Sequence, residues 1–132
     1  MFRARQGKGI VVRTANKIGA LAEFSAIFAD KGVSILAMSA WVEDAEAVIR
    51  LICDDTPRTM GVLRDSGYDP QERDVVLVDA AHQPGILRHL TETLARENIE
   101  IFHLFASAID KNECVAVLNS SDNERAIELL NG

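Results

Sequence analysis

The pattern of apolar and polar positions predicts short strands and helices in a fixed order. Residues 10–14 are rich in β-branched side chains, which indicates a strand. From Ala20 to Gly32, apolar residues recur at helical spacing, which predicts an amphipathic helix that ends at the glycine. Two strands at 33–41 and 45–53 and a second helix at 56–67 follow. Thr56 and Pro57 predict the start of that helix.

The same pattern repeats without a gap at a spacing of 66 residues, the distance from Gly19 to Gly85. Few residues are identical, but the apolar positions agree along all 132 residues. A period of this length predicts two copies of one supersecondary unit, at residues 1–66 and 67–132.

The second copy has the same expected elements as the first. A strand at 75–80 precedes a helix that opens at Pro84, and strands at 99–108 and 113–119 form a hairpin. Ser121 with Glu124 three residues later predicts a capping box before the final helix.

The position of the fourth strand of each unit has two interpretations. Residues 2–8 fall on residues 68–74 at the spacing of 66. If these are edge strands, they are exchanged between the units, and the N-terminal segment completes the sheet of the second copy. The alternative is a frayed N-terminus and an ordinary short connector.

The composition argues against several classes of function. Fourteen basic and twenty acidic residues give a net charge of -6, whereas a nucleic-acid binder needs a basic surface. No apolar run approaches the ~20 residues of a membrane span, and no signal peptide is recognisable. Cys53 and Cys114 lie in apolar runs, so we expect buried thiols in a reducing cytoplasm.

Catalytic chemistry has little support in the sequence. Neither a serine nor a cysteine can be paired with one of the three histidines, at 82, 89 and 103, as nucleophile and base. A glycine-rich phosphate loop and a Cys-x-x-Cys motif are both lacking. We therefore expect a protein that is not an enzyme and that uses no cofactor or metal.

Two motifs carry a family resemblance. Asn16-Lys17-Ile18-Gly19-Ala20-Leu21 and His82-Gln83-Pro84-Gly85-Ile86-Leu87 each join the first strand of a copy to its first helix. This turn, within a βαββαβ unit, resembles that of the ACT domain. Ile18 stands where the family usually has proline, and Asn98 replaces the glycine that ends the first helix, which a left-handed position tolerates.

The resemblance implies an α+β fold. It consists of two ferredoxin-like βαββαβ units, with antiparallel sheets and helices on one face, packed as an internal pseudo-dimer. It also implies an allosteric regulatory protein of amino-acid metabolism that binds a small molecule, most simply an amino acid. A homodimer and a biosynthetic enzyme as partner are further expectations. The alternative is an assembly or interaction protein that keeps the fold and binds no ligand.

The turns are the candidate ligand sites. A helix N-terminus exposes unpaired N–H groups that hold a carboxylate, and a glycine lets the ligand approach the backbone. Asn16 and His82 either accept from an ammonium group or only cap the helix, and the two glycines equally suit close helix–strand contact. By resemblance, residues of the second strands also contribute, although ordinary sheet contacts explain them as well. The candidate ligand-binding residues are Asn16, Ile18, Gly19, Ala20, Leu21, Met38, Ser39, His82, Pro84, Gly85, Ile86, Leu87, Leu104 and Phe105.

The second strands are apolar on both faces, unlike strands with one face in water. Ile35 and Ala37 lie on one face, and Leu36, Met38 and Ala40 lie on the other. We therefore expect another unit, within the chain or across a dimer, to cover the second face.

Overall fold

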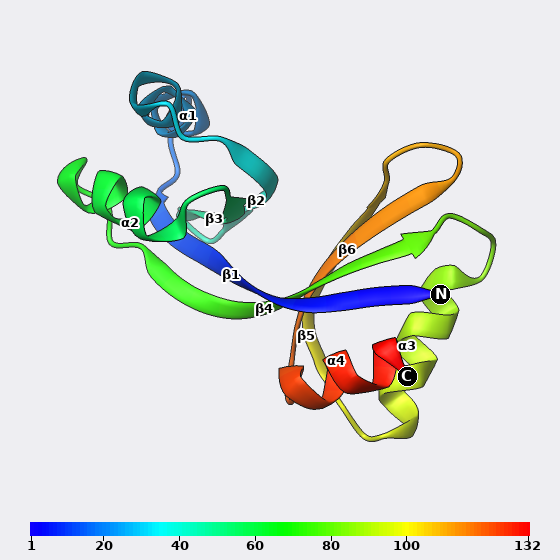
Figure 1. Cartoon of the computed structure of the whole chain (residues 1–132). Helices are drawn as coiled ribbons and strands as arrows, with labels where there is room; N and C mark the ends of the chain where they lie inside the picture. The colour runs from blue at the N-terminus through cyan, green and yellow to red at the C-terminus, as the bar shows by residue number, and fades with distance from the viewer. The chain divides into compact units, whose positions relative to one another are not determined.

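The computed structural model describes all 132 residues, which form six strands and four helices (Figure 1). None of the four helices has the length and apolar character needed to cross a membrane. The elements, in chain order, are β1 (Phe2–Ala15), α1 (Ala20–Lys31), β2 (Ile35–Glu43), β3 (Glu46–Cys53), α2 (Thr56–Asp65), β4 (Gln71–Ala81), α3 (Ile86–Arg96), β5 (Ile101–Ala108), β6 (Glu113–Ser120) and α4 (Asn123–Asn131).

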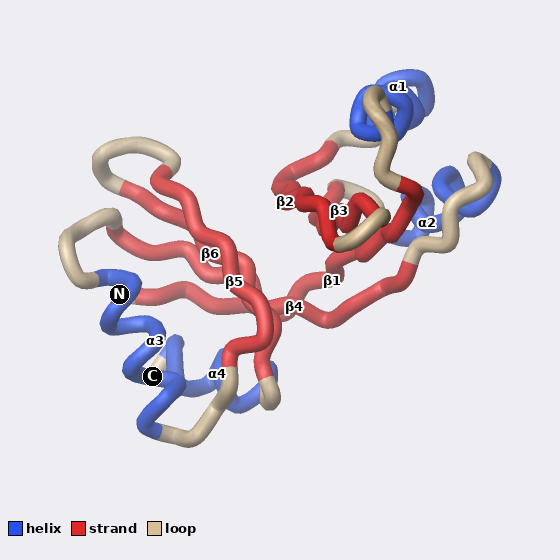
Figure 2. The backbone as a smooth tube through the Cα atoms, turned by 180° about the vertical axis from the view of Figure 1, so that it is seen from behind, coloured by secondary structure: helices blue, strands red, loops and turns tan.

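The chain divides into two compact units, and each unit takes its residues from two parts of the fold. Lys8–Arg73 form what we call the N-terminal unit, whereas Met1–Gly7 join Asp74–Gly132 in the C-terminal unit. The strand order is β2-β3-β1-β4-β6-β5, so β1 and β4 each contribute residues to both units (Figure 2). Each unit therefore contains four antiparallel strands and two helices, as the βαββαβ prediction requires.

The core of the N-terminal unit lies between its sheet and its two helices. Phe24 and Phe28 of α1 contact each other edge to face at 4.9 Å between ring centroids, and Leu63 of α2 is fully buried beside them. Because apolar side chains of all three full strands point to this side, both helices lie on one face of the sheet. The strand residues of this core are Ile10, Val12, Ile49, Leu51 and Cys53.

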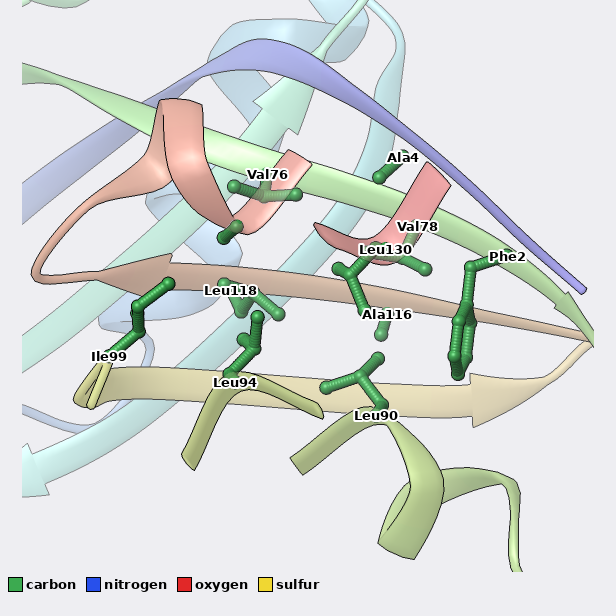
Figure 3. Close-up of a cluster of buried hydrophobic side chains, with 11 residues drawn as sticks. Phe2, Ala4, Val76, Val78, Leu90, Leu94, Ile99, Ala116, Leu118 and Leu130 are labelled. Carbon is green, nitrogen blue, oxygen red and sulfur yellow. The ribbon is translucent and has the colours of Figure 1, made fainter. Parts of the chain in front are cut away.

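The core of the C-terminal unit incorporates the beginning of the chain. Phe2 is buried, only 7% exposed, and its ring stacks on His89 of α3 at 5.3 Å between centroids. Figure 3 shows Phe2 on the same side of the sheet as Leu90 and Leu94 of α3 and Leu130 of α4. Residues near the two ends of the chain therefore share one hydrophobic core.

An asparagine side chain attaches α4 to β1 within the C-terminal unit. The Asn131 Oδ1 accepts from the Ala4 backbone N–H at 2.8 Å, and its Nδ2 donates to the Ala4 carbonyl at 2.9 Å. An amide that satisfies both groups of one residue does what a neighbouring strand would do.

The ungapped repeat is wrong by one residue after the second hairpin. Ile10 pairs with Leu51 in the N-terminal unit, whereas the equivalent Val76 pairs with Leu118, which is 67 residues after Leu51. The physical reason is the hairpin itself. The strands of the first hairpin pair up to Glu43 and Glu46, but the connection from β5 to β6 holds one residue more.

The helix starts follow this shift and correct two expectations. Asp122, not Ser121, is the N-cap of α4, and its side chain accepts from the Arg125 N–H at 3.1 Å. Likewise Asp55, rather than Thr56, caps α2 through the Arg58 N–H at 3.2 Å. A carboxylate is as good an N-cap as a hydroxyl, and the structure uses the acidic residue in both units.

Two helix ends agree with the sequence. Gly32 follows α1 with φ of 67°, and Asn98 occupies the equivalent left-handed position after α3 with φ of 59°. Pro84 differs from its expected role, because α3 begins at Ile86 after an N-cap at Gly85.

Candidate functional site

Each strand–helix turn is fixed against the hairpin of its own unit. The Asn16 N–H donates to the Ala45 carbonyl at 2.9 Å, and the equivalent His82 N–H donates to the Asn112 carbonyl at 2.8 Å. Both turns therefore lie at the hairpin end of the sheet, beside the last residues of β2 or β5.

The start of α1 has backbone donors without a partner. Gly19 is the N-cap, with φ of 89°, and it has no side chain to cap the helix. The Ala20 N–H donates to the Lys17 carbonyl at 3.1 Å, but the Leu21 and Ala22 N–H groups form neither backbone nor side-chain hydrogen bonds. Together with the helix dipole, they attract an anionic group.

A pocket of about 280 Å³, which we call the turn pocket, adjoins this helix start in the N-terminal unit. Four of its ten lining residues are alanines, which leave the space open. An ion pair between Lys17 Nζ and Glu23 Oε2, at 3.3 Å, spans the same turn. The turn pocket is lined by Asn16, Lys17, Gly19, Ala20, Leu21, Ala22, Ala40, Trp41, Val42 and Ala47.

The C-terminal unit has only a crevice of about 40 Å³ in the equivalent place. Ile86 stands at the position of Ala20 and packs against the core of this unit. Phe2 and Leu90 also line the crevice. Larger side chains thus fill the space that alanines leave open in the N-terminal unit.

The structure brings together some of the predicted site residues and separates others. Asn16, Gly19, Ala20 and Leu21 line the turn pocket, and Ile86 and Leu87 line the crevice. Ile18 is fully exposed and lies outside the pocket lining. In the C-terminal unit, His82, Pro84 and Gly85 are exposed and lie outside the crevice lining.

The predicted second-strand residues lie on opposite faces of their sheets. Met38 and Leu104 pair with the core residues Leu51 and Leu118, which places them on the helix face. Their neighbours Ser39 and Phe105 are therefore on the other face. None of the four lines the turn pocket or the crevice.

Sequence reasoning missed the strand residues that do line the turn pocket. These are Ala40, Trp41 and Val42 of β2 and Ala47 of β3. The signal was available in principle, because a turn that follows β1 must meet the hairpin end of its antiparallel neighbour β3, and β2 ends there too.

The charged groups with shifted pKa values lie outside the turn pocket. An ion pair with Glu92 raises the pKa of Arg88 and lowers that of the Glu92 carboxyl, on the exposed side of α3. Burial lowers the pKa of Arg50, on β3. No group of three or more His, Cys, Asp or Glu side chains is placed to hold a metal ion. The geometry of the turn pocket is that of a binding site.

Comparisons with known proteins agree with this architecture. A family model described as an ACT domain pair matches residues 7–131. A crystal structure of a protein from Bacteroides thetaiotaomicron superposes with a TM-score of 0.90 at 23% identity, covering 98% of this chain and 89% of that one.

Two regulatory subunits of aspartate kinase are also similar. The ligand-free subunit from Thermus thermophilus has a TM-score of 0.72 at 12% identity, with 94% of this chain and 90% of that chain covered. The subunit from Thermus flavus has a TM-score of 0.67 at 12% identity, covering 98% and 94%. No curated protein matches the sequence. At these identities, the structural matches establish the fold.

Proposed function

Because the chain belongs to the family of ACT domain pairs, we propose that it is a regulatory protein that senses a free amino acid. The observation that carries this proposal is the turn pocket, which lies against unpaired N–H groups of α1. Its volume of about 280 Å³ is just below the range of about 300–1,000 Å³ typical of ligand pockets, which suits a small molecule.

The pocket offers complementary chemistry to the two ends of an amino acid. The Leu21 and Ala22 N–H groups donate to the α-carboxylate, and the positive end of the α1 dipole favours its charge. Asn16, in the lining, offers an amide oxygen to the α-ammonium group. Alanines and Val42 around the remaining space favour an apolar side chain.

A regulatory role with an enzyme partner is supported by the similar aspartate kinase regulatory subunits. We propose a homodimer, because β2 is an edge strand with Leu36 66% and Val42 58% exposed. In this arrangement, Met38 and Ser39 meet the turn of a second copy, as the family resemblance implies. A cytoplasmic location fits the two free cysteines.

The alternative is an assembly protein that binds no ligand. Two observations favour it: the crevice of the C-terminal unit has almost no free volume, and Ile18 exposes an apolar side chain on the turn. In this case the exposed apolar side chains serve protein contacts only.

A thermal-shift screen of the full chain against the twenty amino acids separates the two functions. A ligand of the native state stabilises it by about 2.7 kcal/mol at a hundredfold excess over Kd. No shift with any amino acid at millimolar concentration would overturn the sensing proposal.

Ala20→Ile tests whether the turn pocket is the site. The equivalent position already holds Ile86 in the C-terminal unit, so the fold accepts this side chain. Ala26→Ile, at an exposed position of the same helix, is the matched control. We expect Ala20→Ile to abolish the shift and Ala26→Ile to retain it, and a shift that persists in Ala20→Ile would place the ligand elsewhere.

A further inference from the structure

The face of the N-terminal sheet opposite α1 and α2, which we call the second face, carries an unusual pair of residues. Ser39 of β2 and Arg50 of β3 are directly opposite each other in the ladder, so their side chains lie on this face together. On the other side of β3, Arg50 pairs with Val11 of β1. Arg13 and Trp41 both pair with Val48, in the neighbouring row of the same face.

Two polar atoms of this pair are left without partners. The Ser39 Oγ and the Arg50 Nε are the buried side-chain polar atoms of the chain that have no hydrogen bond. Buried polar groups are nearly always satisfied, because the loss of water costs free energy. Two orphans on adjacent residues indicate a missing acceptor that both can reach.

The charges around Arg50 point to the same conclusion. Arg13 has carboxylate partners, Glu46 at 3.6 Å and Glu43 at 3.9 Å. Arg50 has no such partner, and its guanidinium carbon lies 5.8 Å from the centroid of the Trp41 ring. Burial lowers the pKa of Arg50, and the positive charges of Arg73 and Arg13 lower it further.

Arg73 adds a second uncompensated cation. Its printed hydrogen bond goes to the Glu72 backbone carbonyl, at 3.0 Å, rather than to a carboxylate. Glu43, the nearest acidic group of this region, is already engaged by Arg13 and by the Trp41 indole N–H at 3.2 Å. A partly buried cation among like charges is costly unless an anion accompanies it.

We propose that the second face of the N-terminal unit binds a small oxyanion, a carboxylate or a phosphate, through the Arg50 guanidinium and the Ser39 hydroxyl. Both groups donate to the oxygens of the anion, and Arg73 contributes charge. This site is on the opposite face from the turn pocket and does not depend on it.

The C-terminal unit lacks this site. Phe105 and Val117 occupy the directly opposed positions of Ser39 and Arg50. Asp79 stands in place of Arg13, and Gly7 in place of Arg73. The proposal therefore requires one anion per chain.

Calorimetric titration of the full chain at constant ionic strength tests the proposal. Inorganic phosphate and acetate are the two probes, and they distinguish the phosphate from the carboxylate. We expect saturable binding of at least one probe, with one anion per chain. Trp41 is the only tryptophan, so its emission gives a second reading of the same event.

Three variants identify the residues. Arg50→Gln is expected to raise the Kd at least tenfold, and Ser39→Ala a few-fold. Arg64→Gln removes the same charge from an exposed position of α2 and should bind as the native chain does. The bound anion should also raise the melting temperature of the native chain but not that of Arg50→Gln.

Either of two results would overturn the site: no saturable binding of either probe, or equal binding by Arg50→Gln and the native chain. Ala20→Ile, which closes the turn pocket, should leave anion binding unchanged. The failure of the second-face site is thereby distinguishable from the failure of the turn pocket.

Discussion

The two units share one backbone plan but differ in what their side chains leave open. Both have a left-handed glycine before the first helix and the same turn-to-hairpin hydrogen bond. Yet the N-terminal unit has a pocket of about 280 Å³ where the C-terminal unit has a crevice of about 40 Å³. The change from Ala20 to Ile86 accounts for much of this difference. A repeat thus conserves a scaffold without conserving a site.

The second faces differ in the same direction. Ser39 and Arg50 in the N-terminal unit correspond to Phe105 and Val117 in the other. Unsatisfied polar groups therefore lie in the N-terminal unit, and the C-terminal unit is apolar at the same place. Binding chemistry is concentrated in one unit, whereas both retain a complete core.

The largest expected difference concerns the equivalent aromatic residues Phe2 and Tyr68. Phe2→Ala should lower the free energy of unfolding by about 3–5 kcal/mol, because the ring is buried among leucines. Tyr68→Ala should lower it less, since Tyr68 is only half-buried, with an edge contact to Phe24 at 5.4 Å. Urea denaturation followed by circular dichroism measures both, and equal losses would contradict the comparison.

A smaller difference is expected at the ends of the second helices. Asn131→Ala removes both hydrogen bonds to Ala4 and should cost about 1–3 kcal/mol. Arg64→Ala, the equivalent change in the N-terminal unit, should alter stability by less than about 0.5 kcal/mol, because Arg64 is exposed. The same denaturation experiment compares them. An undiminished stability of Asn131→Ala would show that the attachment is dispensable.

The smallest effect should be the same in both units. Asp55→Ala and Asp122→Ala each remove an N-cap and should each cost about 1 kcal/mol. Thr56→Ala leaves the Asp55 cap in place and serves as control, with its thermal midpoint close to that of the native chain. A larger loss in Thr56→Ala than in Asp55→Ala would restore the cap assignment made from the sequence.

Much of the fold was predictable because its signals are local. Apolar spacing predicted the helices, and Gly32 and Asn98 marked where the first helix of each unit ends. The extra residue in the second hairpin was not predictable, because the apolar runs of β3 and β6 are long enough to align at either spacing. Ser121 and Asp122 are both good capping residues, and only the backbone decides between them.

The site was predicted where it follows the chain and missed where it crosses the sheet. Asn16, Gly19 and Leu21 were predicted from the turn motif, and they line the turn pocket. Trp41 and Ala47 were missed, because their proximity depends on strand register. Arg50 gave no sequence signal, since an arginine in a strand looks solvated until its partner strands are known.

The shared strand β1 has a consequence for how the protein comes into being. Lys8–Arg73 are contiguous, so the N-terminal unit can form while later residues are still being synthesised. The C-terminal unit cannot, because Ala4 must wait for Asn131, 127 positions later. Closing a loop of this size is slow relative to local helix and hairpin formation. The segment at the start of β1 emerges early and reaches its place late.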